Sequence, residues 1–127
     1  MRQLKFNQTY YKVLLTIKLL NDLNYYPLNE GVFKILSGKI DDETERFSAF
    51  PTFGTLSSFT NKKISHLTLM LFRHGYINKI FDSKRNKLYF RITEFGEQSL
   101  DTYGKKHKLR FSHRKTRFEE TIVKIDD

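Results

Sequence analysis

The strongest fold signal lies in residues 60–92, which read TNKKISHLTLMLFRHGYINKIFDSKRNKLYFRI. The first half, about Asn61–His74, has helical spacing, with one side formed by Ile64, Leu67 and Leu71. The opposite side, at steps of four, three and four, carries Lys62, His66, Leu69 and Arg73. Thr60 is a suitable N-cap, and Gly75 a suitable stop. The spacing therefore predicts a helix with one core face and one basic face.

The second half of this stretch has the pattern of a β-hairpin. Residues 76–81 and 87–92 are rich in the apolar and aromatic side chains that strands favour, and the polar run 82–86 separates them. We therefore expect a hairpin with a charged tip directly after the helix.

Two further helices are expected upstream. Within Thr9–Leu23, helical spacing relates Tyr10, Val13, Leu14, Ile17 and Leu20. The segment 24–27 interrupts this pattern. Asn29 is predicted to cap a second helix, which ends at Gly38 and whose apolar positions are Val32, Ile35 and Leu36.

The remaining segments are shorter. Residues 39–51 have no long apolar period, so they are expected to form a loop or a ragged helical turn with a solvated acidic cluster at Asp41, Asp42, Glu43 and Glu45. Residues 53–59 resemble a short extended or one-turn element. Thr93 is expected to cap a short closing helix that reaches Leu100, and the folded body is expected to end near Tyr103.

This order of elements predicts a mainly α fold with a small β-hairpin (α+β), of the winged helix-turn-helix type. In that fold the third helix reads the DNA groove and the hairpin is the wing. The winged-helix domain is expected over 1–103, followed by a basic C-terminal extension over 104–127. Within the extension, 104–117 has no acidic residue, and 118–127 is compatible with an added strand, a partner-facing segment or a frayed terminus.

Composition restricts the class of protein. A chain of 127 residues fits one domain, and the absence of cysteine excludes disulfides, a thiol nucleophile and zinc sites with thiolate ligands. The chain has no apolar run long enough to span a membrane and no signal-peptide pattern, so a cytoplasmic protein is expected. Lys+Arg 23 against Asp+Glu 14 gives a net charge of +9, which favours a polyanionic partner.

Charge and position together select candidate DNA contacts. Cations and hydroxyls near a helix N-terminus, on a groove-facing helix or on a wing can hold phosphates, although each is also common on an ordinary solvated surface. The third helix contributes Asn61, Lys62, Lys63, His66 and Arg73. The segments before it contribute Lys39, Thr55, Ser57 and Ser58. The hairpin contributes Lys79, Lys84, Arg85 and Lys87, and the extension Lys105, Lys106, Lys108 and Arg110.

Residues 35–100 resemble the RQC domain, the winged-helix module of RecQ-family helicases, and above all its small stand-alone bacterial relatives. Four segments carry the resemblance: Ile35-Leu36-Ser37-Gly38-Lys39, Phe53-Gly54-Thr55, Leu71-Phe72-Arg73-His74-Gly75-Tyr76-Ile77 and Thr93-Glu94-Phe95-Gly96. The resemblance implies duplex DNA as the partner, with phosphates held near Lys39, after Gly54 and at the start of the third helix. It also implies a hairpin that acts as a wedge at a duplex end.

The chain departs from that family at the hairpin tip. Strand-separating members carry an aromatic residue there, whereas this tip is Ser83-Lys84-Arg85-Asn86, and the nearest aromatics are Phe81 and Tyr89. The chain also lacks a phosphate-binding loop and zinc cysteines, so it is not a helicase by itself.

No catalytic or metal-binding pattern is recognised. His66, His74, His107 and His113 have no ligand spacing, and the acidic cluster lacks the second acidic group of a metal-dependent nuclease. We therefore expect a non-enzymatic protein without cofactor or metal that binds double-stranded DNA, alone or within a larger DNA-processing complex. The alternative is a winged-helix protein-docking module or transcriptional regulator, whose sign would be an exposed apolar third helix at Leu69, Met70 and Phe72.

Overall fold

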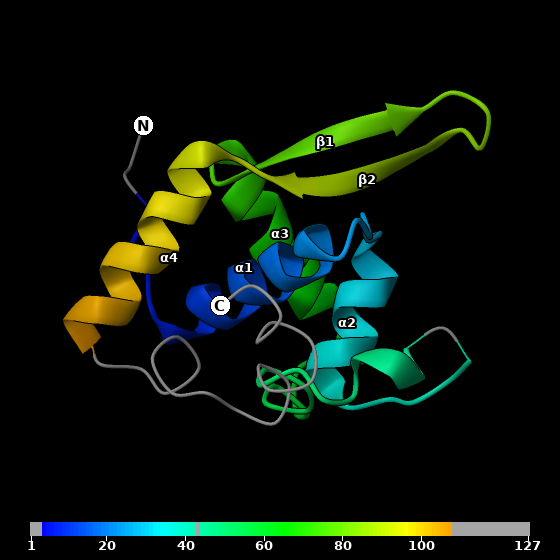
Figure 1. Cartoon of the computed structure of the whole chain (residues 1–127), viewed down its shortest axis with the longest axis horizontal. Helices are drawn as coiled ribbons and strands as arrows, with labels where there is room; N and C mark the ends of the chain where they lie inside the picture. The colour runs from blue at the N-terminus through cyan, green and yellow to red at the C-terminus, as the bar shows by residue number, and fades with distance from the viewer. Residues whose placement is uncertain (1–3, 43, 108–127) are drawn as a thin grey trace.

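The computed structural model describes residues 4–42 and 44–107, and this part of the chain forms an α+β fold of four helices and one antiparallel hairpin (Figure 1). The hairpin follows the third helix and projects from the helical body. The elements are α1 (Gln8–Asp22), α2 (Asn29–Ser37), the 3-10 turn η1 (Glu45–Phe47), α3 (Asn61–Arg73), β1 (Ile77–Asp82), β2 (Lys87–Ile92) and α4 (Glu94–His107).

Helix α1 lies at the centre of the body, in contact with the other three helices and with β2. It begins after Asn7, whose side-chain oxygen accepts a hydrogen bond from the backbone N–H of Tyr10 at 3.0 Å. Such a cap satisfies an N–H that the first turn leaves without a helical partner. The predicted apolar stripe is confirmed, because Val13, Leu14 and Ile17 are fully buried.

Helices α2 and α3 pack against each other, and one prediction about α2 is wrong. Its N-cap position is Leu28, without a side-chain hydrogen bond, so Asn29 is not the cap. The Asn29 amide instead joins the two helices: it donates to Asn61 Oδ1 at 2.9 Å and accepts from the Thr68 hydroxyl at 2.9 Å. The predicted cap of α3 is confirmed, since Thr60 Oγ1 accepts from the Lys63 N–H at 3.1 Å.

Of the two conformations expected at 53–59, the structure shows turns and not an extended segment. This segment folds as successive turns, for example through the Thr55 N–H to Thr52 carbonyl bond of 3.1 Å. It is fixed to the end of α2, because the Gly54 N–H donates to the Ile35 carbonyl at 2.9 Å. Both Gly38 and Gly54 have positive φ, and a Cβ on Gly38 would lie 3.2 Å from Gly54 Cα. Two separate segments of the RQC resemblance therefore lie in contact here.

The predicted hairpin is confirmed, with Ile77 opposite Ile92 at its base and Asp82 opposite Lys87 at its outer end. The connection between α1 and α2 contacts the hairpin. The Phe90 N–H donates to the Pro27 carbonyl at 2.9 Å, and Asn21 Oδ1 accepts from the Ile92 N–H at 2.7 Å. These bonds fix the base of the hairpin to the helical body.

Helix α4 is longer than predicted. Thr93 caps it as expected, with its hydroxyl oxygen accepting from the Gly96 N–H at 3.0 Å. The helix then continues past Leu100 to His107, and Gly104 is buried, so the predicted division between 103 and 104 lies inside a helix. No helix of the described residues is both long and apolar enough to cross a membrane.

Candidate nucleic-acid interface

Helix α3 has two chemically different faces, as its spacing predicts. Its core face consists of the buried residues Ile64, Leu67, Thr68 and Leu71. Its outer face is polar and cationic, where Lys62, Lys63, His66 and Arg73 are exposed, and Leu69 is half-buried among them. Four of the predicted contacts therefore lie on the solvent side of a single helix.

The positive charge of α3 has no acidic counterpart nearby in the sequence. Residues 46–81 contain no aspartate or glutamate. Within residues 4–42 and 44–107, no carboxylate lies within ion-pair distance of Lys62, Lys63 or Arg73. An uncompensated cationic face attracts polyanions more strongly than one neutralised by its own side chains.

Helix α3 and the hairpin form one continuous surface. The Lys79 ammonium on β1 lies 4.6 Å from the centre of the Phe72 ring on α3. Beside this contact is a groove of about 350 Å³, lined by Leu28, Asn29, Ser65, Thr68, Leu69, Lys79, Leu88 and Phe90. Lys79 is therefore placed between the cations of α3 and those of the hairpin turn.

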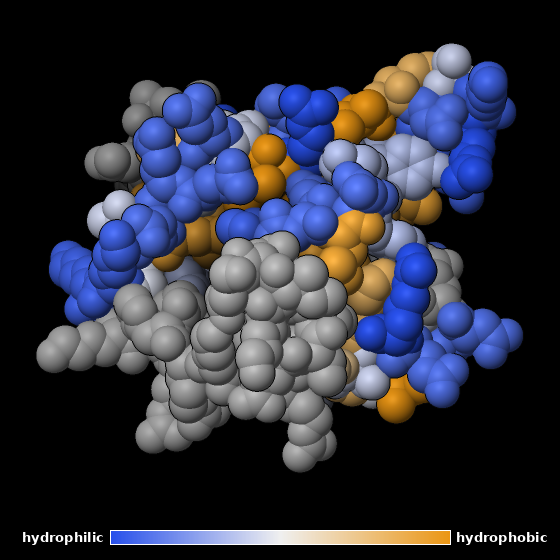
Figure 2. Space-filling view, viewed as in Figure 1, coloured by the Kyte–Doolittle hydropathy of each residue, from blue (hydrophilic) through white to orange (hydrophobic). Residues whose placement is uncertain are grey.

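The hairpin turn carries most of the remaining predicted contacts. Lys84 and Lys87 are exposed, without an ion pair to any described residue. Arg85 is partly engaged: a hydrogen bond to the Tyr89 side chain and then the nearby charge of Asp82, 3.9 Å away, raise the pKa of its guanidinium. Figure 2 shows this turn as a hydrophilic outer end of the projecting hairpin.

Two of the polar residues predicted as contacts near the start of α3, Thr55 and Asn61, already have hydrogen-bond partners. The Thr55 hydroxyl donates to the Thr52 carbonyl at 2.7 Å, so its proton is already used within the turn. The Asn61 amide oxygen accepts from Asn29, which leaves its NH2 group as the donor. Ser57 and Ser58 are exposed, and the exposed Lys39 lies with its ammonium 4.9 Å from the centre of the Phe33 ring.

The cations of α4 do not join this surface. Lys105 forms an ion pair of 3.0 Å with Asp101, and Lys106 is exposed. In Figure 1 the C-terminal end of α4 and the turn of the hairpin lie at opposite ends of the molecule. Lys108 and Arg110 lie outside the described residues.

One part of the acidic cluster is not simply solvated, contrary to the sequence-based expectation. Asp41 pairs with Lys34 at 2.7 Å, and Glu30 approaches the same ammonium at 3.3 Å. The hydrogen bond to Asp41, followed by that to Glu30, raises the pKa of Lys34. Within the described residues, no three histidine or acidic side chains are grouped so that they could hold a metal ion.

Sequence reasoning also missed exposed apolar side chains at the hairpin. Phe81 is 57% exposed and faces Leu88, which is 47% exposed, across the two strands. The position of these two residues could have signalled this exposure, because they form the strand pair next to the one at the turn, near the outer end of the hairpin. Of the three apolar α3 residues that the docking alternative names, Phe72 is 38% exposed, whereas Leu69 and Met70 are half-buried.

No protein-family model matches this chain, and comparisons with curated proteins and with solved structures found no match. The resemblance to RQC domains therefore stays a prediction.

Proposed function

We propose that this chain is a non-enzymatic winged-helix protein of RQC type that binds duplex DNA in the cytoplasm. In this proposal α3 enters the major groove with Lys62, His66 and Arg73 outward, and the hairpin lies along the adjacent backbone as the wing. The observation that carries the proposal is the outer face of α3, whose cations have no ion pair with a described residue. Affinity comes mainly from phosphate contacts, alone or within a larger DNA-processing complex.

The position of Lys79 supports the same proposal. Its contact with Phe72 places a cation at the junction of helix and hairpin. The phosphate backbone of a DNA strand that runs from the α3 surface to the hairpin would contact Lys79. This lysine would lie between the α3 cations and the exposed Lys84 and Lys87.

A second candidate, a protein-docking module or transcriptional regulator, is favoured by the exposure of Phe72, Phe81 and Leu88. A docking surface usually has an apolar centre of this kind. In the DNA-binding proposal the same apolar side chains lie between the cations of α3 and those of the hairpin turn.

The test is fluorescence anisotropy of a labelled duplex, with the variant Lys62→Ala with Arg73→Ala. We expect a loss of about tenfold or more in affinity at moderate salt, because two phosphate contacts are removed. The matched control is Lys18→Ala with Lys34→Ala, which has the same net charge but removes lysines already paired with Asp22, Glu30 and Asp41. The control should stay within about twofold of the wild type. Equal losses in both variants would overturn the proposal.

A further inference from the structure

A second hollow lies on the other side of the hairpin, away from α3. It has a volume of about 640 Å³ and lies between the outer half of the hairpin and the α1–α2 connection. Its lining consists of Asn24, Tyr25, Tyr26, Ile80, Phe81, Asp82, Ser83, Lys84, Arg85 and Tyr89. Figure 2 shows the outer end of the hairpin overhanging the body at this place.

The two walls of the hollow are held in place by the fold. Asn21 donates to the Tyr25 carbonyl at 3.1 Å and accepts from the Ile92 N–H at 2.7 Å, so one side chain connects α1, the connection and β2. Asn24 has a φ of 61°, a left-handed conformation that asparagine tolerates, and the chain turns there to present Tyr25 and Tyr26. These contacts fix the wall formed by the α1–α2 connection and the base from which the hairpin extends over the hollow.

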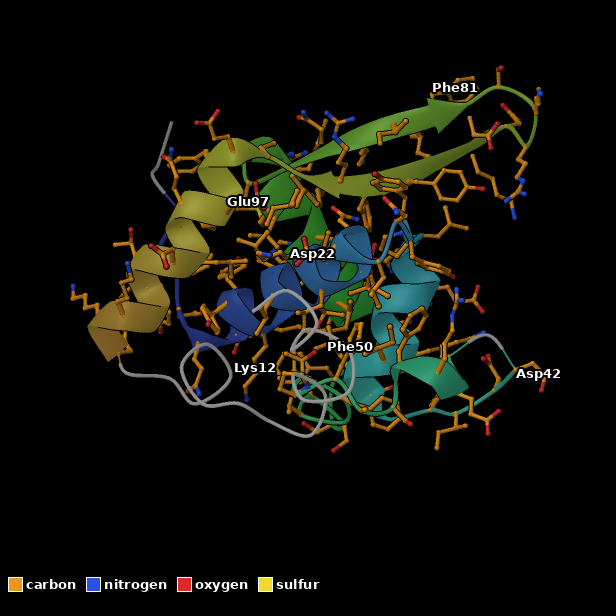
Figure 3. The ribbon with its side chains drawn as sticks, in the orientation of Figure 1. Lys12, Asp22, Asp42, Phe50, Phe81 and Glu97 are labelled. Atoms are coloured by element: carbon orange, nitrogen blue, oxygen red, sulfur yellow. The ribbon has the colours of Figure 1, made fainter. Side chains whose placement is uncertain are left out.

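Aromatic rings and cations line the hollow together. Ile80 and Tyr89 are opposite each other in the strand register and share the face of the hairpin that borders the hollow. Tyr26, on the opposite wall, is 39% exposed. The other face of the hairpin carries Phe81, which Figure 3 places at the outer end of β1, beside the turn.

The cations stand at the rim. Lys84 and Arg85 are exposed, and both line the hollow. Arg46 supports the other wall, with its guanidinium carbon 5.3 Å from the centre of the Tyr25 ring. Asp82 is the one carboxylate in the lining, and it already interacts with Arg85 and with the Lys84 N–H.

We infer that this hollow binds an unpaired nucleotide, with its base on the Tyr26 and Tyr89 side and its phosphate at Lys84 and Arg85. A flat aromatic base stacks on tyrosine irrespective of its sequence, and a phosphate satisfies lysine and arginine donors. The volume lies in the range of small-ligand sites. Because the hairpin also borders the surface of α3, the preferred ligand is a duplex that continues as a single strand. This last step rests on the proposed function.

The test compares four labelled probes: a blunt duplex, the same duplex with a short thymidine overhang, the same overhang made of abasic units, and the single strand alone. The overhang is placed at the 5′ end of one strand in one version of the probe and at the 3′ end in another. We expect the thymidine overhang of one polarity to increase affinity about tenfold over the blunt duplex. This gain corresponds to the binding free energy of one base stacked on an aromatic side chain. The abasic overhang has the same phosphates, so it should recover only a small part of this gain.

Variants localise the effect. Tyr26→Ala and Tyr89→Ala should each remove most of the gain from the overhang while blunt-duplex binding stays unchanged, and Tyr26→Phe should retain it. The matched control is Phe95→Ala, which removes an aromatic ring that is 50% exposed on α4 and does not line the hollow. A 2-aminopurine placed in the overhang reports stacking directly through a change in its fluorescence, which Tyr26→Ala should abolish.

The outcomes separate the two proposals. If the duplex binds but no overhang improves affinity, the inference about the hollow is wrong and duplex binding stands. If the single strand binds through Tyr26 and Tyr89 but the duplex does not, the proposed function is wrong and the hollow stands. Competition by free thymidine monophosphate as strong as by the overhang would contradict a strand as the ligand.

Discussion

Helices α2 and α3 pack against each other, but the positive side chain of α2 is paired with carboxylates and, among the described residues, those of α3 are not. On α2, Lys34 contacts two carboxylates, those of Glu30 and Asp41. On α3, the exposed Lys62, Lys63 and Arg73 contact none among the described residues. Helices α1 and α4 resemble α2, since Lys18 pairs with Asp22 and Lys105 with Asp101, each four residues apart.

The comparison teaches that net charge and available charge differ. A lysine beside a carboxylate attracts a phosphate less strongly than an unpaired lysine, because the carboxylate offsets its charge and repels the phosphate. The chain has a net charge of +9, but among the described residues the exposed cations without a carboxylate partner lie mainly on α3 and at the hairpin turn, while most of the acid-free run 104–117 lies outside the described residues. The following predictions test this difference, from the largest expected effect to the smallest.

Giving α3 the acid that the other helices have should reduce binding most. In His66→Glu, the new carboxylate lies four residues after Lys62 and three after Lys63, within reach of both on an exposed face. We expect about a tenfold or larger loss of duplex affinity and little change in thermal stability. The matched variant His66→Gln has no charge and should lose much less. If the two variants bind DNA equally, the outer face of α3 does not face the ligand.

Removing acids elsewhere should have a smaller effect. Asp22→Asn with Glu30→Gln raises the net charge by two and frees Lys18 fully and Lys34 in part. We expect an increase in duplex affinity of no more than about threefold, because neither lysine lies on the α3 surface. An increase as large as the loss in Lys62→Ala with Arg73→Ala would mean that total charge, and not its position, determines binding.

The smallest effect concerns stability at alkaline pH. Because Asp41 and Glu30 raise the pKa of Lys34 in the folded state, folding is stabilised while the lysine is protonated. That contribution is complete below the ordinary lysine pKa of about 10.5 and is lost as the pH rises through the higher folded value. Lys34→Met should therefore lower the urea midpoint slightly at neutral pH and leave it unchanged at strongly alkaline pH. An equal decrease at both values would exclude an electrostatic origin.

Local signals predicted much of this fold correctly. The spacing of Ile64, Leu67 and Leu71 locates α3 and its two faces, and the polar run 82–86 locates the hairpin turn. These features depend on residues that are close together along the chain, so they can be predicted from the sequence. The position of Thr60 is also a local property, since its hydroxyl needs only the N–H of Lys63.

Features that depend on distant contacts were predicted less well. Asn29 has the residue type of an N-cap, but its partners Asn61 and Thr68 lie in another helix. Helix α4 contains two glycines, Gly96 and Gly104, and extends past the predicted end at Leu100. The structure shows that Gly96 lies so close to the Tyr76 carbonyl that a Cβ would collide with it, and that Gly104 is buried. At Gly96 the absence of a side chain permits this close approach of α4 to Tyr76.

The candidate site was also predicted only in part. Exposure of the α3 cations follows from helical spacing, whereas the engagement of Thr55 by Thr52 and of Arg85 by Asp82 depends on the geometry of the local turn, which residue type alone does not determine. The hollow beneath the hairpin combines Tyr26 with Tyr89, residues brought together by the Phe90 to Pro27 bond. No spacing rule relates such positions.

The most direct test of the account is the salt dependence of duplex affinity for the wild type, Lys62→Ala with Arg73→Ala, and Lys18→Ala with Lys34→Ala. The slope of log affinity against log salt falls by about 0.9 for each phosphate contact that is lost. We predict that the α3 variant has a slope smaller in magnitude by about 1.8, whereas the control variant keeps the slope of the wild type. An α3 variant with the wild-type slope would contradict the claim that the unpaired cations of α3 hold the phosphates.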